Sequence, residues 1–110
     1  AKVGVFGFSF KENCPDIRNT KVVSMIKVLQ SYHMQVFVHD PVVDEKEVLA
    51  KYGIQLVSLC QINNMDAIII AVPHDQFKGF LFYNFLNENG ILIDIKNVNY
   101  DSKESALIGR

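Results

Sequence analysis

The stretch Asp66-Ala67-Ile68-Ile69-Ile70-Ala71-Val72 is the most apolar run of the chain, and it decides the fold class. It has the length of a strand, and an unbroken apolar run is typical of a strand buried on both faces of a parallel sheet. We therefore expect residues 66–72 to form a central strand. The run Lys-Val-Gly-Val-Phe-Gly-Phe at residues 2–8 is rich in Val and Phe and predicts a second buried strand.

Strand-like and helix-like segments alternate outward from these two runs. Further strand patterns, rich in β-branched or apolar residues, occupy residues 35–39, 54–57 and 90–95. Helical patterns lie between them, at residues 22–32, 44–52 and 58–63, and residues 74–85 are helical or partly so. Asn19 or Thr20 can cap the first helix, and Gly53 can end the second. The alternation predicts a Rossmann-like, three-layer α/β domain with a mainly parallel sheet of about five strands and helices on both faces.

Length and charge restrict the class of protein. The chain has 110 residues and a formal net charge of -1 at pH 7, which fits a single domain over residues 1–110. The near-neutral charge and the lack of any apolar run near 20 residues speak against a nucleic-acid or membrane binder. We expect a cytoplasmic protein. Because the sequence opens in a strand without an initiator Met, we also expect it to be a piece of a longer protein.

The charged loop after the first strand is the main candidate site. In parallel sheets, ligands bind at the carboxyl ends of the strands, where residues 9–18, 72–75 and 94–97 are expected to gather. Lys11 offers an ammonium suited to phosphate, and Arg18 offers a planar donor fork. Two interpretations are open at this point. The loop is either a phosphate site or a solvated polar loop with an internal Asp16–Arg18 pair.

A dinucleotide fingerprint is absent from this loop. The motif GxGxxG places its glycines in the strand-to-helix turn, where the backbone approaches a pyrophosphate. Here Gly4 and Gly7 are spaced GxxG, and Ser9, Phe10 and Lys11 occupy the turn. We interpret the two glycines as packing positions, and we do not expect this domain to be the primary NAD site.

The cysteines and histidines show no metal-ligand spacing, so no metal site is predicted. Cys14 and Cys60 are expected to be free thiols, with Cys60 in the core. His74 lies at the expected ligand edge and is the one histidine with a functional case, although a structural role is the favoured interpretation. The dense aromatic run at residues 77–85 is explained mostly by core packing. Its excess predicts a surface covered by other domains or by a second subunit.

The loop also carries a family resemblance. Residues 7–20, Gly-Phe-Ser-Phe-Lys-Glu-Asn-Cys-Pro-Asp-Ile-Arg-Asn-Thr, resemble the pattern G-x-x-F-K-x-x-x-x-D-x-R-x-S/T. This pattern opens the C-terminal domain of the UDP-glucose/GDP-mannose dehydrogenase family. The sequence of residues 12–20 is closer to that of the branch that oxidises UDP-N-acetylhexosamines for bacterial surface polysaccharides. Residues 38–41 and 66–72 resemble later, weaker family motifs.

The resemblance implies roles for individual residues. Phe10 and Lys11 are expected to lie against the UDP-sugar, and Arg18 to reach toward NAD. Lys96 matches a position that meets the phosphates or sugar of the nucleotide. In that family an N-terminal Rossmann domain binds NAD, and a central helical region carries the nucleophilic cysteine. No catalytic residue is therefore expected within this chain, and the chain alone is not expected to turn over.

The resemblance further implies that the full-length protein is an NAD-dependent UDP-sugar 6-dehydrogenase. Such an enzyme oxidises a UDP-hexose or UDP-N-acetylhexosamine to the uronate, and we expect it to be a homo-oligomer. The rival hypothesis is a non-catalytic nucleotide- or anion-binding regulatory module, which the fold alone does not exclude. A response-regulator-like domain is disfavoured, because a lysine rather than an acidic pair follows the first strand. The sequence does not identify the sugar, since most residues that contact the hexose are expected elsewhere.

Overall fold

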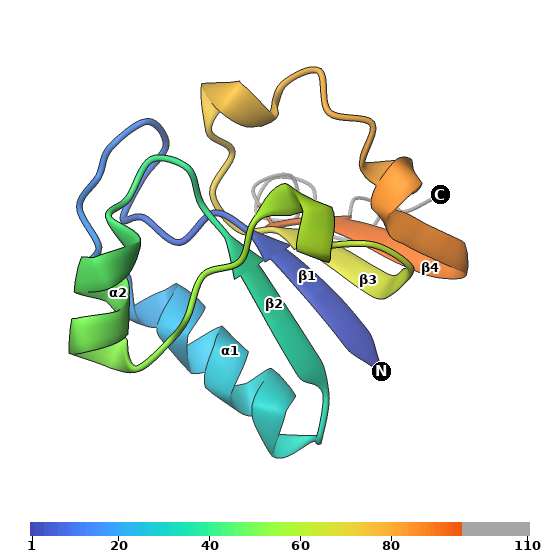
Figure 1. Ribbon diagram of the computed structural model, residues 1–110, viewed down its shortest axis with the longest axis horizontal. Coiled ribbons are helices and arrows are strands. Elements are labelled where there is room, and N and C mark those ends of the chain that lie inside the picture. Colours follow the sequence, from blue (N-terminus) through green and yellow to red (C-terminus); the bar gives the residue numbers. More distant parts are fainter. Residues whose placement is uncertain (96–110) are drawn as a thin grey trace.

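A four-stranded parallel sheet forms the centre of the computed structural model, which describes residues 1–95 (Figure 1). The strands are β1 (Lys2–Phe6), β2 (Gln35–His39), β3 (Met65–Ile70) and β4 (Leu86–Asp94), in the order β2-β1-β3-β4. Each strand runs parallel to its neighbour. The apolar run that was expected to be central is indeed an inner strand, β3.

Two α-helices follow the first and second strands, and both begin and end as the sequence predicts. Helix α1 (Thr20–Ser31) is capped by Asn19, whose side chain accepts a backbone N–H of the first turn. Helix α2 (Glu45–Tyr52) is capped in the same way by Asp44. It ends at Gly53, which has a left-handed φ of 71° that glycine adopts without strain.

The two faces of the sheet are covered differently. On one face, Val5 of β1 and Ile69 of β3 share a core with buried residues of α1 and α2. On the other face, Phe6 and Ile68 share a core with Phe77, which lies in a 3₁₀ turn. This second layer is made of the 3₁₀ turns Leu59–Gln61, Asp75–Phe77 and Phe82–Phe85. Within residues 1–95, α-helices therefore cover one face and not both.

One expected strand is missing, so the number of strands also differs from the expectation. Residues 54–57 do not form a strand, because only Leu56 pairs with β2, through an isolated bridge to Val38. Gln55 points into solvent, and a 3₁₀ turn begins directly after Ser58, so the segment leaves the sheet edge at once. The described sheet thus has four strands rather than about five. Residues 74–85 were expected to be helical or partly so, and they are partly helical, because they contain two short 3₁₀ turns.

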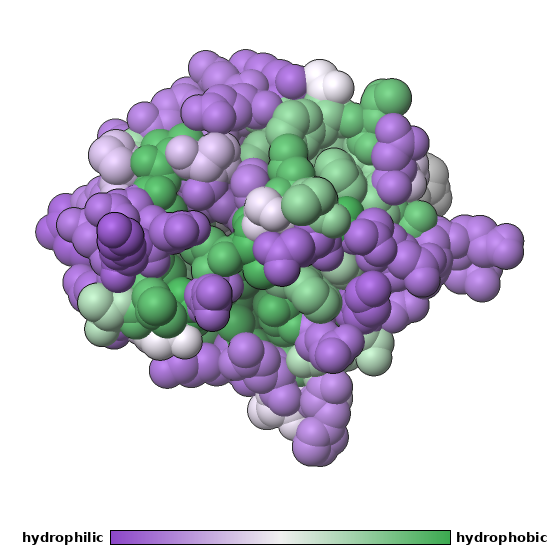
Figure 2. All heavy atoms as spheres, viewed as in Figure 1, coloured by the Kyte–Doolittle hydropathy of each residue, from purple (hydrophilic) through white to green (hydrophobic). Residues whose placement is uncertain are grey.

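Phe6 lies at the centre of an aromatic cluster that explains most of the phenylalanine-rich segment. Its ring centroid is 5.0–6.2 Å from those of Phe77, Phe80, Phe82 and Phe85. Figure 2 shows apolar side chains gathered in the middle of one face of the molecule, with polar side chains around them. Leu81 and Tyr83 in this segment remain more than half exposed, so core packing does not account for all of it.

Replacing Phe6 tests whether this cluster stabilises the fold. Phe6 is fully buried, and Phe6→Ala removes ring contacts and leaves a cavity. We expect a loss of about 3–5 kcal/mol in the free energy of unfolding, measured by urea titration. The matched control is Tyr32→Ala, since the Tyr32 side chain is 70% exposed and should change stability by less than about 0.5 kcal/mol. Equal effects of the two variants would contradict this account of the core.

Candidate functional site

The ends of three strands meet closely at the carboxyl edge of the sheet. Gly7 follows β1 with a φ of +101°, and its N–H donates to the carbonyl of His39 at 2.9 Å. A Cβ atom on Gly7 would lie 2.6 Å from atoms of Val72, which follows β3. Only glycine fits this position, so its interpretation as a packing residue is confirmed. The same close approach brings the loop after β1 next to the turn after β3.

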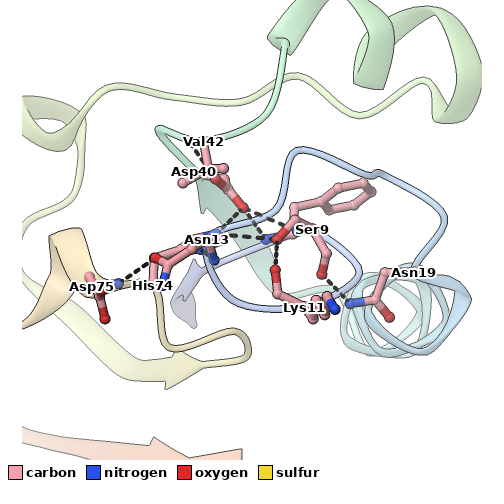
Figure 3. Close-up of polar contacts among 9 residues, drawn as sticks. Ser9, Lys11, Asn13, Asn19, Asp40, Val42, His74 and Asp75 are labelled. Atoms are coloured by element: carbon pink, nitrogen blue, oxygen red, sulfur yellow. Dashed lines mark hydrogen bonds and ion pairs between the residues drawn. The ribbon is translucent and has the colours of Figure 1, made fainter.

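A buried Asp40–His74 pair links these strand ends (Figure 3). The Asp40 carboxylate, at the end of β2, accepts the backbone N–H groups of Phe8 at 2.6 Å and Ser9 at 3.1 Å. It also lies 2.8 Å from Nε2 of His74, and its second oxygen accepts the N–H of Val42 at 2.7 Å. Phe8 and Ser9 follow β1, Val42 follows β2 and His74 follows β3. The pair therefore ties the start of the β1 loop to the sheet.

Hydrogen bonds within the loop and to His74 hold the first half of the loop in place. The Ser9 hydroxyl donates to the Lys11 carbonyl at 2.8 Å, and the N–H of Cys14 donates to the same oxygen at 3.3 Å. Asn13 turns the chain with a positive φ of 61°, a conformation that Asn adopts more readily than most residues. Its N–H donates to Nδ1 of His74 at 2.8 Å. These contacts fix the backbone on both sides of the Lys11 side chain.

The second half of the loop contains the predicted ion pair. Arg18 donates from Nε and Nη2 to the Asp16 carboxylate, with the shortest distance 2.6 Å. The side-chain hydrogen bond from Arg18 lowers the pKa of Asp16 from 3.8 to about 2. A lowered pKa means that this carboxylate stabilises the folded loop above pH 3.8 and that the contribution disappears as the pH falls through about 2. The hydroxyl of Tyr52 donates to the carbonyl of Ile17 at 2.9 Å and anchors this half to α2.

An open cleft of about 280 Å³ lies between this loop, the first turns of α1 and the turn after β3. Its lining includes two of the predicted site residues, Phe10 and Lys11. Lys21 lines it from α1, and Ile95 lines it from the end of β4. Within residues 1–95, neither lysine has an ion-pair partner. Glu12 also lines the cleft, which thus combines two lysines and one carboxylate with an exposed phenyl ring. The excess of positive charge and the ring suit an anionic ligand that carries a flat or apolar part.

The remaining predicted residues lie in different places. Arg18 is outside the cleft lining, in its pair with Asp16, and its side chain is 75% exposed. Lys96 lies outside the described residues. Cys14 is half-buried in the loop, and neither cysteine is in a disulfide. The prediction that Cys60 is in the core is wrong, because a 3₁₀ turn places its Sγ at the surface, 3.1 Å from Oγ of Ser58.

Sequence reasoning missed several residues that shape the site. Lys21 and Asp40 were assigned no role in the site. The available pattern was a polar residue at the end of each of three strands, namely Ser9, Asp40 and His74. His74 was assigned no particular role, although a structural one was favoured, and the structure places it fully buried between Asp40 and Asn13.

Comparison with known proteins identifies the family. Residues 4–101 match the model of the UDP-glucose/GDP-mannose dehydrogenase family, UDP binding domain. The chain belongs to this family. The resemblance noted in residues 7–20 is therefore confirmed, and the match extends over nearly the whole chain. It disfavours the rival hypothesis of an unrelated regulatory module.

Individual relatives agree with this placement. The chain is 44% identical over 101 residues to the UDP-N-acetyl-D-glucosamine 6-dehydrogenase of Salmonella typhi, and 37% identical over 102 residues to protein CapL of Staphylococcus aureus. These matches cover 89% of this chain and 24% of each relative, so the chain spans about a quarter of the length of those proteins. The solved structure of the UDP-D-ManNAc dehydrogenase from Pyrococcus horikoshii matches with 25% identity and a TM-score of 0.66, covering 86% of this chain and 21% of that one.

Residues 1–95 of this UDP-binding domain contain neither a candidate metal site nor a candidate membrane-spanning helix. No group of three or more His, Cys, Asp or Glu side chains in residues 1–95 is arranged to hold a metal ion. Among the helices of the same residues, none combines the length and the apolar character that crossing a bilayer requires. The anionic-ligand cleft is the candidate site that the geometry supports.

Exchange of one oxygen of Asp40 tests the role of the buried carboxylate. In Asp40→Asn, the new amide N–H₂ must face a backbone N–H or the His74 ring, because both oxygens of Asp40 accept hydrogen bonds. We expect a loss of about 1–3 kcal/mol in the free energy of unfolding. Asp44→Asn is the control, since Asp44 is exposed and Asn caps helices about as well as Asp. Thermal or urea unfolding of both variants measures the difference, and an unaffected Asp40→Asn protein would refute the role.

Proposed function

We propose that the cleft binds the UDP part of a UDP-sugar, with the diphosphate beside Lys11. The observation that carries the proposal is the pair of lysines, Lys11 and Lys21, that have no ion-pair partner within residues 1–95 and line a cleft at the carboxyl edge of the sheet, in a chain that matches the UDP-binding domain of the family. An ammonium group is a compact charge with several donors and suits a phosphate oxygen. The Phe10 side chain is 57% exposed and offers an apolar ring to the uracil or the sugar.

Lys96 extends this proposal to the end of β4. Ile95, the last described residue, lines the cleft, and Lys96 follows it in the sequence. We propose that Lys96 contributes a further positive charge to the phosphates or the sugar of the ligand. Lysine supplies that charge without the bidentate fork of arginine.

Arg18 is proposed to face NAD rather than the UDP-sugar. Its guanidinium lies outside the cleft lining and is largely exposed, although Nε and Nη2 are engaged by Asp16. Arginine has five donors, so the paired guanidinium can still meet a second anion from solvent or from another domain. The Asp16 pair would hold the fork in place for that contact. The turn after β1 lacks a dinucleotide fingerprint, so we assign the main NAD site to a part of the protein outside this chain.

For the full-length protein we propose an NAD-dependent UDP-sugar 6-dehydrogenase. Relatives that match over 79 to 101 residues include UDP-N-acetyl-D-glucosamine and UDP-N-acetyl-D-mannosamine dehydrogenases, whereas a UDP-glucose 6-dehydrogenase matches over 48 residues. The longer matches favour a UDP-N-acetylhexosamine over a UDP-hexose. The product would be the uronate, used for surface polysaccharides. We also propose a cytoplasmic location and a homo-oligomeric enzyme.

In such a reaction this chain would bind and position the UDP-sugar. NAD, when bound elsewhere in the protein, would supply the hydride acceptor, and Lys11 and Lys21 would hold the diphosphate so that the sugar end points out of the cleft. Neither cysteine of the chain lies in the cleft lining. We therefore propose that the nucleophile belongs to another part of the protein and that the chain alone binds UDP without oxidising a UDP-sugar.

Removal of the Lys11 charge tests the proposal. Calorimetric titration of Lys11→Ala with UDP should show an affinity about 10- to 100-fold below that of the wild type, as expected for one charge-assisted hydrogen bond. Uridine lacks the diphosphate and should bind both proteins equally. Lys27→Ala is the control, because Lys27 is exposed on α1 but does not line the cleft. UDP binding that survives Lys11→Ala unchanged would contradict the role of this lysine.

A further inference from the structure

We propose that His74 is a positioning residue for the ligand, which holds the Lys11 loop in its binding shape through one ring nitrogen and anchors it to the sheet through the other. This inference rests on the proposed function of the cleft. His74 does not line the cleft itself but lies behind the loop that does. Its side chain is fully buried.

The two ring nitrogens have different partners. Nδ1 accepts the backbone N–H of Asn13 at 2.8 Å, so in the neutral ring the hydrogen lies on Nε2. Nε2 lies 2.8 Å from Asp40 and 3.3 Å from the Ser9 hydroxyl, and it donates to the Asp40 carboxylate. One nitrogen thus contacts the loop, and the other contacts the end of β2.

The Asn13 contact matters for the ligand because it shapes the backbone around Lys11. Asn13 has a positive φ, and its side-chain oxygen accepts the N–H of Asp75, so the loop and the turn after β3 hold each other. Cys14 and Ser9 then fix the carbonyl of Lys11. Release of Asn13 would loosen this turn and spread the Lys11 ammonium over many positions. Binding would weaken because the ligand must then order the loop.

The contact with Asn13 requires an acceptor at Nδ1, and several titratable groups lie near the ring. Asp40 faces Nε2 from β2, and Asp75 follows in the chain, where it pairs with Lys78. The rings of His39 and His74 both contact Phe77, with centroid distances of 6.4 and 5.3 Å. A second proton on the His74 ring would sit on Nδ1 and oppose the N–H of Asn13. It would keep the Asp40 contact and break the loop contact.

Two substitutions separate the two nitrogens. In His74→Asn the amide oxygen can take the place of Nδ1, which keeps an acceptor for Asn13 and loses the reach to Asp40. In His74→Gln the longer amide can donate to Asp40 and leaves Asn13 without its acceptor. The control is His33→Asn, because His33 is exposed, lies outside this network and has a positive φ of 65° that Asn tolerates.

The experiment measures UDP affinity, the stability of each variant to urea and the hydrogen exchange of the Asn13 amide, all on the whole chain. We expect His74→Gln to bind UDP about five- to tenfold more weakly, as for the loss of one hydrogen bond, and to exchange the Asn13 amide faster. His74→Asn should keep UDP affinity within about twofold and lose more stability than His74→Gln, because the buried Asp40 loses its partner.

The outcomes are distinguishable. Parallel losses of stability and affinity in both variants would indicate a merely structural residue and overturn the inference, as would wild-type affinity and Asn13 exchange in His74→Gln. Failure of the wild-type chain to bind UDP would overturn the proposed function instead. In that case the Asn13 exchange alone decides: faster exchange in His74→Gln than in His74→Asn supports the positioning of the loop, and equal exchange overturns it.

Discussion

The buried carboxylate of Asp40 is the contact on which the geometry of the site depends. A carboxylate inside a protein must be hydrogen-bonded, because an unpaired one is strongly penalised by its loss of water. Asp40 meets that demand with donors from Phe8, Ser9, Val42 and His74, which lie in the segments that follow β1, β2 and β3. Satisfying one charge therefore fixes the start of the loop after β1 against the turn after β3.

The carboxyl edge of the sheet has a buried inner layer, which holds the loop in place, and an exposed outer layer, which lines the cleft. The inner layer is polar and fully bonded, since every buried side-chain nitrogen or oxygen in residues 1–95 has a partner. The outer layer presents Phe10, Lys11 and Lys21 to the cleft, and the two lysines are left without ion-pair partners in the described part of the chain. Charges without partners favour an anionic ligand, and a fixed backbone lowers the entropic cost of holding it.

Local patterns predicted more of this domain than long-range contacts did. Apolar runs located the inner strands, and the strand-to-loop transition placed Lys11 at the ligand edge, because both follow from neighbouring residues. Phe10 was expected there only from the family resemblance. The Asp40–His74 pair joins residues 34 positions apart, and no periodicity reports such a contact. Lys21 was not assigned to the site for a related reason. It is exposed, as helical spacing predicts, but that spacing does not report that a cleft lies there. Residues 54–57 have strand composition, but only Leu56 finds a partner at the edge of β2.

UDP is proposed to bind at the edge formed by Phe10, Lys11 and Lys21. The most direct test is a titration of the isotope-labelled chain with UDP, followed by the backbone amide resonances in nuclear magnetic resonance spectra. The account predicts that the largest shifts fall on residues 10–13, on the first turn of α1 and on Val72, the residues at or beside the cleft. Shifts concentrated elsewhere, for example in the hollow lined by His39 and Ser58 beyond the end of β2, or no shifts at millimolar UDP, would contradict it.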